Sequence, residues 1–190
     1  MFDNRKVKTF LLITTFSLLL IFMIVNLETT AANPVDREIR DLVLENRTST
    51  MDEVMDGLTK LGNKEMVIPA VLLMSDNEMR EDYAKSLLFT ASTTQLLKIM
   101  IGQKRPPGPV EYKPFTNDNE YHAMPSGHAT GAFAMARVVA HHYPEYKEHA
   151  YILASLIAFS RVYKDRHWFS NVAAGAGVGY FGTGFVLERW

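Results

Sequence analysis

The sequence predicts an all-α protein, a bundle of about five or six helices behind one N-terminal signal or anchor segment. Two observations carry this prediction. Several stretches after residue 33 have the composition and the end signals of helices, and no stretch alternates between apolar and polar residues as strands do. A chain of 190 residues is long enough for one domain with a substantial core, which we place at residues 33–190.

Residues 1–32 are predicted to form a signal peptide or a membrane anchor followed by the start of a linker. Arg5, Lys6 and Lys8 precede an uncharged run from Thr9 to Val25. A basic stretch before an apolar run is typical of a signal peptide or of a single anchor with its N-terminus inside. The sequence leaves both alternatives open, because a fair small-residue cleavage site follows the run. In either case the chain after about Asn26 is expected outside the cytoplasm.

The remainder of the chain is expected to be a soluble helical domain. The mean hydropathy is −0.05, and the apolar run from Met66 to Met74 is much shorter than the ~20 residues of a spanning helix. The net charge is −1 with no block of like charge, so nothing favours a nucleic-acid partner. The absence of cysteine excludes disulfides and thiolate metal sites.

The expected helices are separated by turn signals. A capping box at Thr50 and Glu53 opens one helix, and Gly102 closes a long one. The loop after Gly102 is rich in proline and turn residues, and loops of its length are usually functional. The longer helical stretches are 82–101, 127–142, 149–160 and 171–187, and a short amphipathic piece precedes Thr50 at 36–46.

Two other patterns are set aside. Gly177, Gly179 and Gly182 match a dinucleotide fingerprint, but no strand precedes them and only eight residues follow. We expect Gly175 and Gly179 to let two helices approach closely. The second pattern is a polar cluster around the turn at Pro144, which we interpret as a solvated loop: His141, His142, Glu145, Glu148 and His149.

Three short stretches carry a candidate site. In KIMIGQKRP, Lys98 precedes Arg105 by seven residues, the first in the last turn of a helix and the second just past its glycine cap. In PSGH, Ser126 and Gly127 lie at a predicted helix start. Backbone N–H groups at a helix start bind anions, and a glycine there lets the anion approach closely.

The third stretch is SRVYKDRHWFSN, which contains Arg161, His167 and Asn171. With the first two it supplies three cations, a helix start and two histidines. This set suits a phosphoryl group, whose charge is spread over oxygens that need several fixed donors. His128 and His167 would then provide a general acid and a nucleophile without a metal.

The three stretches K-x6-RP, PSGH and SR-x5-H-x3-(D) resemble the signature of the type-2 phosphatidic acid phosphatase superfamily, over residues 98–171. The resemblance implies a helical bundle with an extracytoplasmic active site and no metal or cofactor. It also implies that His167 forms a phosphohistidine and that His128 protonates the leaving alcohol. The phosphate ligands implied are Lys98, Arg105, Ser126, Gly127 and Arg161.

Asn171 departs from this signature, because the family has aspartate there. The residue would accept the Nδ1 proton of His167, and its spacing of four would place the two on one face of a helix. An amide oxygen can accept that proton but gives the imidazolium no charge stabilisation. We therefore expect a slowed site, and we expect Asn171→Asp to raise turnover about ten- to a hundredfold.

The expected function is a phosphatase acting on a lipid phosphate or diphosphate, of the phosphatidic acid or polyprenyl diphosphate type, at the outer face of a membrane. Two alternatives stay open. One is a nonspecific acid phosphatase acting on small phosphate esters, and the other is a catalytically impaired lipid-phosphate binding protein. A vanadium haloperoxidase is disfavoured, because the chain has no room for the additional helices of those relatives.

Overall fold

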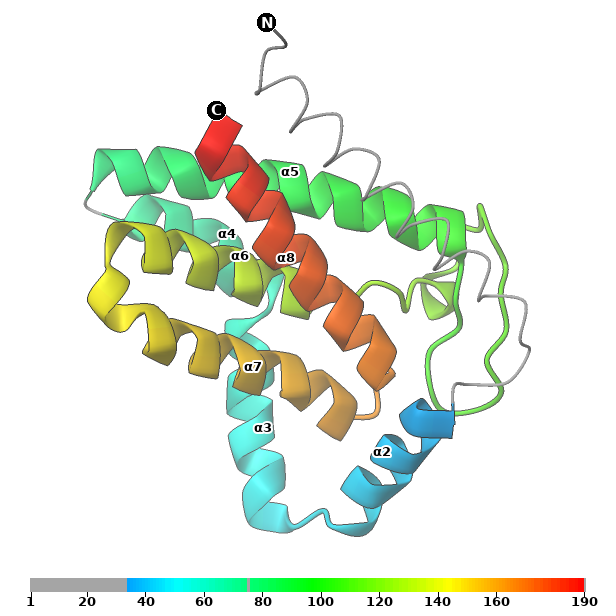
Figure 1. Ribbon diagram of the computed structural model, residues 1–190. Coiled ribbons are helices and arrows are strands. Elements are labelled where there is room, and N and C mark those ends of the chain that lie inside the picture. Colours follow the sequence, from blue (N-terminus) through cyan, green and yellow to red (C-terminus); the bar gives the residue numbers. More distant parts are fainter. Residues whose placement is uncertain (1–33, 75, 190) are drawn as a thin grey trace, which may run out of the picture.

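The computed structural model describes residues 34–74 and 76–189, whose regular structure is helical (Figure 1). The all-α class is thus confirmed, with seven α-helices and no strand in this part of the chain. The predicted N-terminal signal or anchor lies outside the described residues. None of the described helices combines the length and the apolar character needed to cross a bilayer. The helices are α2 (Pro34–Glu45), α3 (Ser49–Leu61), α4 (Lys64–Leu73), α5 (Asn77–Ile101), α6 (Gly127–His142), α7 (Lys147–Tyr163) and α8 (Phe169–Arg189).

Two of the helix starts that differ from the sequence prediction follow side-chain caps. The side chain of Asp76 accepts the backbone N–H groups of Glu78 and Met79, so α5 begins at Asn77 rather than near residue 82. The cap of α3 is Thr48, which accepts from the N–H of Met51 at 3.3 Å, so the predicted capping box at Thr50 is wrong.

The end of α5 confirms the prediction for Gly102. This residue is left-handed, with φ of +58°, and its N–H donates to the carbonyl of Lys98. A Cβ added at Gly102 would lie 2.1 Å from the carbonyl oxygen of Lys113. Only glycine therefore lets the following loop fold back against the helix end.

Helix α6 lies at the centre of the bundle and packs against α5, α7 and α8, with α8 crossing it obliquely (Figure 1). Small residues allow this close packing. A Cβ at Gly175 or Gly179 of α8 would lie 2.4 Å from a carbonyl oxygen of α6 or its cap, that of Ser126 or Thr130. The predicted close approach of two helices is confirmed, and the glycines of the dinucleotide pattern lie within α8.

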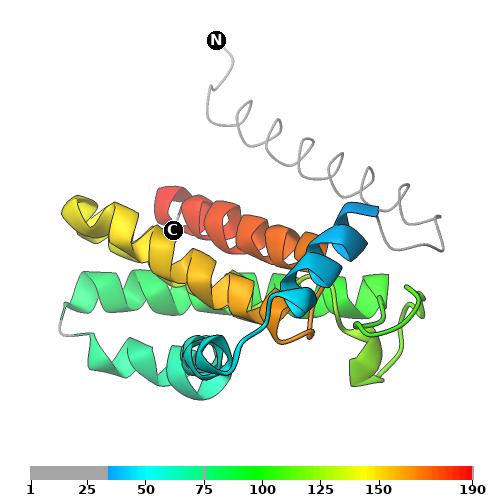
Figure 2. The same cartoon turned by 90° about the horizontal axis from the view of Figure 1, so that it is seen from below.

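Helix α2 holds the loop between α7 and α8, as Figure 2 shows from a second side. The guanidinium of Arg40 donates to both carboxylate oxygens of Asp165, at 2.6 and 2.7 Å. The carboxylate of Asp36 accepts from the backbone N–H and the hydroxyl of Ser170, at 2.7 and 2.6 Å. The segment between these two anchors carries His167, so α2 fixes it from both sides.

Candidate active site

The three stretches predicted from the sequence meet at one end of the bundle, where α5 and α7 end and α6 and α8 begin (Figure 1). Three of their side chains are deeply buried, with exposed fractions of 8% for Lys98, 0% for Ser126 and 4% for His167. Separate elements supply the set: α5 (Lys98), the loop after it (Arg105), the start of α6 (Ser126, Gly127, His128), the last turn of α7 (Arg161) and the loop before α8 (His167).

The imidazole of His167 lies between a backbone acceptor and a cation. Its Nδ1 lies 2.8 Å from the carbonyl oxygen of Ala123, and its Nε2 lies 2.9 Å from Nη1 of Arg105. A carbonyl can only accept, so Nδ1 carries the proton and Nε2 presents a lone pair. Burial, followed by the nearby cations, holds the pKa of His167 well below its usual range. The ring is neutral at pH 7, in the form that a nucleophile requires.

The expected contact between Asn171 and His167 is not made. Asn171 lies in the first turn of α8, whereas His167 precedes that helix, so the two do not share a helix face. The side-chain oxygen of Asn171 accepts from the N–H of Trp168 at 3.1 Å, and its amide donates to Gln103. The acceptor that orients His167 is instead the carbonyl of Ala123. Asn171 fixes the start of α8.

The second histidine, His128, lies in the first turn of α6. Its Nε2 donates to the side-chain oxygen of Asn63 at 2.8 Å, and its ring packs against Gly62, where a Cβ would lie 2.9 Å away. Burial, followed by the charge of Arg161 and two further cations, lowers the pKa of His128 to about 3. His128 is therefore neutral at pH 7, and an anion bound beside it would raise this pKa.

The three cations around the histidines are partly desolvated and repel one another. Burial, followed by the charge of Arg105, lowers the pKa of Lys98 to about 7 and that of Arg161 to about 10. Burial also lowers the pKa of Arg105, although the neighbouring carboxylate of Glu120 opposes the shift. Cations held together in this way are stabilised by an anion that neutralises them.

Two polar atoms of the site are buried without a hydrogen-bond partner, namely Oγ of Ser126 and Nε of Arg161. Ser126 occupies the N-cap position of α6, yet its hydroxyl does not cap the helix. Buried donors are rarely left unpaired in folded proteins. A Cβ added at Gly127 would meet no atom within 4 Å, so there is space beside the helix start.

The site opens in two directions. One opening is a polar pocket of about 420 Å³, lined by Thr59, Arg105, Asn119, Glu120, Arg161, Lys164 and Arg166. The other is a groove of about 860 Å³ between α4, α5 and α6, which reaches Lys98, Gly127 and His128. The walls of this groove are mainly apolar and include Val67, Ile68, Val71, Leu87, Leu88 and Ala91.

The groups that hold the site side chains in place were not found from the sequence. The carbonyl oxygen of His122 accepts from Lys98 at 2.7 Å and from Arg105 at 3.2 Å. Asn63 lies 65 positions before the histidine that it contacts. Backbone carbonyls carry no residue-type signal, and no spacing rule pairs residues so far apart in the chain.

Fold and site together define an all-α protein in which three cations, two histidines and a helix start lie at one end of the bundle. Residues 82–189 match the PAP2 superfamily, and this range holds every candidate site residue from Lys98 to Asn171. The chain belongs to the PAP2 superfamily, which confirms the resemblance seen in the three motifs.

Two relatives show what the chain is similar to. Phosphatidylglycerophosphatase B of Bacillus subtilis (strain 168) is 27% identical over 183 residues, which cover 86% of this chain and 88% of that protein. The lipid A 1-phosphatase of Porphyromonas gingivalis is 32% identical over 140 residues, which cover 64% of this chain and 28% of that longer protein. The chain is thus a member of a phosphatase family that has lipid phosphate phosphatases among its relatives.

Two crystal structures share the fold. Aquifex aeolicus LpxE superposes with a TM-score of 0.72 at 19% identity, over 83% of this chain and 97% of that one. The first transmembrane PAP2-type phosphatidylglycerolphosphate phosphatase from Bacillus subtilis gives 0.61 at 22% identity, over 91% and 94%. At these identities the structures confirm the helical fold.

Proposed function

We propose that the chain hydrolyses a lipid phosphate or diphosphate through a phosphohistidine on His167, with no metal or cofactor in the reaction. The observation that carries this proposal is the state of His167, which is neutral and has the lone pair of Nε2 directed at the guanidinium of Arg105. If Arg105 donated its N–H groups to a bound phosphoryl group, it would no longer donate to Nε2 of His167. The lone pair would then face the phosphorus.

In the first half-reaction, the lone pair of Nε2 of His167 attacks the phosphorus and forms a P–N bond. The bond between phosphorus and the leaving oxygen breaks, and its electron pair stays on that oxygen. The charge of the bound phosphate raises the pKa of His128, which takes up a proton from solvent and gives it to the leaving oxygen. The groups proposed to hold the phosphoryl oxygens are Lys98, Arg105, Ser126, Gly127 and Arg161.

In the second half-reaction, water attacks the phosphohistidine and His128, now neutral, accepts a proton from that water. The P–N bond breaks, its electrons return to Nε2 of His167, and inorganic phosphate leaves. The carbonyl of Ala123 holds Nδ1–H throughout, so the same ring nitrogen is regenerated.

The apolar groove supports a lipid as the leaving group. His128, which would protonate the leaving oxygen, lines this groove, whereas Arg105 and Arg161 face the polar pocket. A phosphate between the two openings would direct its alcohol into the groove and leave the polar side for water. Each buried methylene contributes roughly 0.8 kcal/mol, which favours long chains. The names of the relatives, phosphatidylglycerophosphatase and lipid A 1-phosphatase, support the same substrate class.

We further propose that the site works on the extracytoplasmic side of a membrane. The support is the basic and apolar sequence of the first 25 residues together with the membrane phosphatase named among the solved relatives. A reporter fused to the C-terminus should be exported and active outside the cytoplasm. A reporter that is active only in the cytoplasm would contradict this orientation.

The phosphohistidine is tested by trapping. Denaturing the full-length protein during turnover of ³²P-labelled phosphatidic acid should leave an acid-labile, base-stable label on His167. His167→Ala should carry no label and should turn over no phosphate ester. A label that survives in His167→Ala would show that another residue is the nucleophile.

The lipid proposal is tested by narrowing the groove. Ala91 lines the groove and is exposed, so Ala91→Trp should lower kcat/KM for phosphatidic acid and a polyprenyl diphosphate at least tenfold and leave an aryl phosphate unaffected. Ser92→Trp is the matched control, because Ser92 is exposed on the same helix outside the groove. Equal activity of both variants on all three substrates would favour a nonspecific acid phosphatase. Phosphate binding without any turnover would favour the impaired binding protein.

A further inference from the structure

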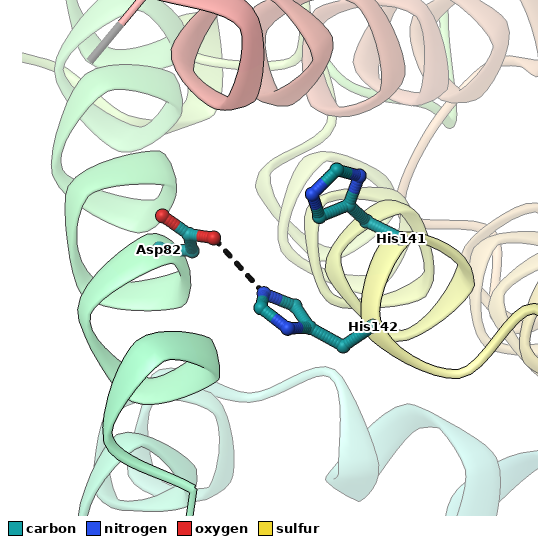
Figure 3. Close-up of side chains that lie close together, drawn as sticks. All are labelled: Asp82, His141 and His142. Atoms are coloured by element: carbon teal, nitrogen blue, oxygen red, sulfur yellow. Dashed lines mark hydrogen bonds and ion pairs between the residues drawn. The ribbon is translucent and has the colours of Figure 1, made fainter.

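A second group of ligand-type side chains lies at the opposite end of α6 from the candidate active site. The carboxylate of Asp82 on α5 and the imidazoles of His141 and His142 at the end of α6 point into one space between the two helices (Figure 3). The sequence placed these histidines in a polar loop with Glu145 and His149, whereas the fold brings them to a carboxylate 60 positions earlier.

The spacing of the three side chains suits a single metal ion. One ligand atom from each lies within 4.8 Å of those from the other two, and Nε2 of His142 lies 2.9 Å from Oδ2 of Asp82. Two atoms bound to one zinc ion at 2.0–2.2 Å in tetrahedral geometry lie about 3.3 Å apart. These side chains are exposed or half-buried. Rotations that move their ligand atoms by about 1 Å would therefore bring all three atoms into one coordination shell. Within the described residues, these three side chains form the group of at least three histidines or carboxylates whose ligand atoms lie this close together.

We infer that Asp82, His141 and His142 form a binding site for one divalent transition-metal ion of the zinc class, which links α5 to the end of α6. Two imidazole nitrogens and one carboxylate oxygen are borderline ligands, which suit Zn²⁺ better than Mg²⁺ or Ca²⁺. The carbonyl dipoles at the C-terminus of α6 add favourable charge for a cation. His141 is exposed, so the ion enters from solvent and water completes its shell.

This metal site is structural rather than catalytic. The start and the end of α6 are separated by 15 residues, or about 22 Å of helix. The ion cannot reach a phosphate at His128. Its effect is to add a link between two helices that already pack at this end through Met79, Tyr83 and Val138.

Isothermal titration of Zn²⁺ into the untagged, chelator-treated full-length protein tests the site. One zinc ion should bind per chain, and zinc at about a hundred times Kd should raise Tm by several degrees. His141→Ala and Asp82→Asn should each weaken binding at least ten- to a hundredfold, since loss of an outer-shell partner alone has that effect. His149→Ala is the matched control, because it removes an exposed imidazole just outside the cluster and should leave Kd unchanged.

Several outcomes would overturn the inference. The first is absence of zinc binding by the unaltered protein. The second is unchanged zinc binding in both His141→Ala and Asp82→Asn, and the third is an equal loss of zinc affinity in the control His149→Ala. Substitution of Co²⁺ provides an independent measurement, because bound cobalt should show ligand-field absorption that His141→Ala loses. His141→Ala should keep full phosphatase activity, and a loss of activity on removal of the ion would contradict a structural role.

Discussion

The two ends of α6 place histidines in opposite electrostatic settings. At the start, burial and then the charges of three neighbouring cations lower the pKa of His128 to about 3. At the end, His142 contacts the carboxylate of Asp82 at 2.9 Å. The groups around His128 therefore suit the anion proposed there, and those around His142 suit the cation inferred above.

The two ends also differ in their effect on stability. The buried ammonium of Lys98, whose pKa is lowered to about 7, is held in a setting that disfavours its charge. The side chains at the opposite end are half-buried or exposed, and water screens them. In the proposed anion site, a residue assigned to phosphate binding thus lowers the stability of the fold.

The largest expected effect separates the two histidines. His128→Ala should lower kcat for an alkyl phosphate about 10²- to 10⁴-fold, because the leaving alkoxide is no longer protonated. An aryl phosphate, which needs little protonation, should be affected much less. His142→Ala should change kcat for either ester less than about twofold. Steady-state kinetics on both esters measures this. Equal losses of kcat for the two esters in His128→Ala would contradict the proposal that His128 is the general acid.

The next effect concerns Lys98, whose replacement should weaken anion binding and raise stability. Lys98→Met should weaken binding of inorganic phosphate about ten- to a hundredfold, through loss of a charged donor. It should also raise the free energy of unfolding at pH 7 by roughly 2–4 kcal/mol, because it removes a cation that burial destabilises. The carbonyl of His122 keeps a donor in this variant, since Arg105 also contacts it.

The stability gain of Lys98→Met should depend on pH with a definite sign. Below pH 7 the lysine is charged in both the folded and the unfolded protein, so the gain is complete. Between pH 7 and about 10 the folded protein releases the proton and the unfolded chain retains it, so the gain shrinks. Denaturant titrations at pH 6, 8 and 10 measure this. Lys64→Met, at a largely exposed lysine, should show no such trend, and a pH-independent gain at Lys98 would show that its pKa is not lowered.

A smaller effect concerns the pH dependence of anion affinity. Sulfate stays a dianion across the neutral range, so changes in its Kd report on the protein. The Kd should rise by up to tenfold per pH unit above about pH 7, as Lys98 loses its charge. Lys98→Arg keeps its charge throughout and should flatten this rise. A rise that persists in Lys98→Arg would assign the titration to another group.

The smallest effect is expected at Asn171. Because the acceptor for Nδ1 of His167 is the carbonyl of Ala123, Asn171→Asp should change kcat less than about threefold. This replaces the gain of ten- to a hundredfold expected from the sequence. The buried carboxylate should lower stability modestly instead, because Asn171 is fully buried. A gain above tenfold in kcat would show that residue 171 reaches His167 during turnover.

The sequence predicted what local composition and motif spacing determine. The bounds of α6, the cap at Gly102 and the packing role of Gly175 and Gly179 follow from local rules, and the family follows from three motifs. The predicted contact of Asn171 with His167 is wrong, because a spacing of four pairs residues only inside a helix and α8 begins after the histidine. Contacts between distant segments depend on how helices pack, which no local pattern records.

We propose that an oxyanion at the start of α6 sits against Nε2 of His167. Tungsten anomalous scattering from crystals of the full-length protein soaked in tungstate tests it most directly. We predict one strong peak with Nε2 of His167 as the nearest protein atom, within reach of Lys98, Arg105 and Arg161. A peak only in the outer polar pocket against Lys164 and Arg166, with Arg105 still on Nε2, would contradict the claim.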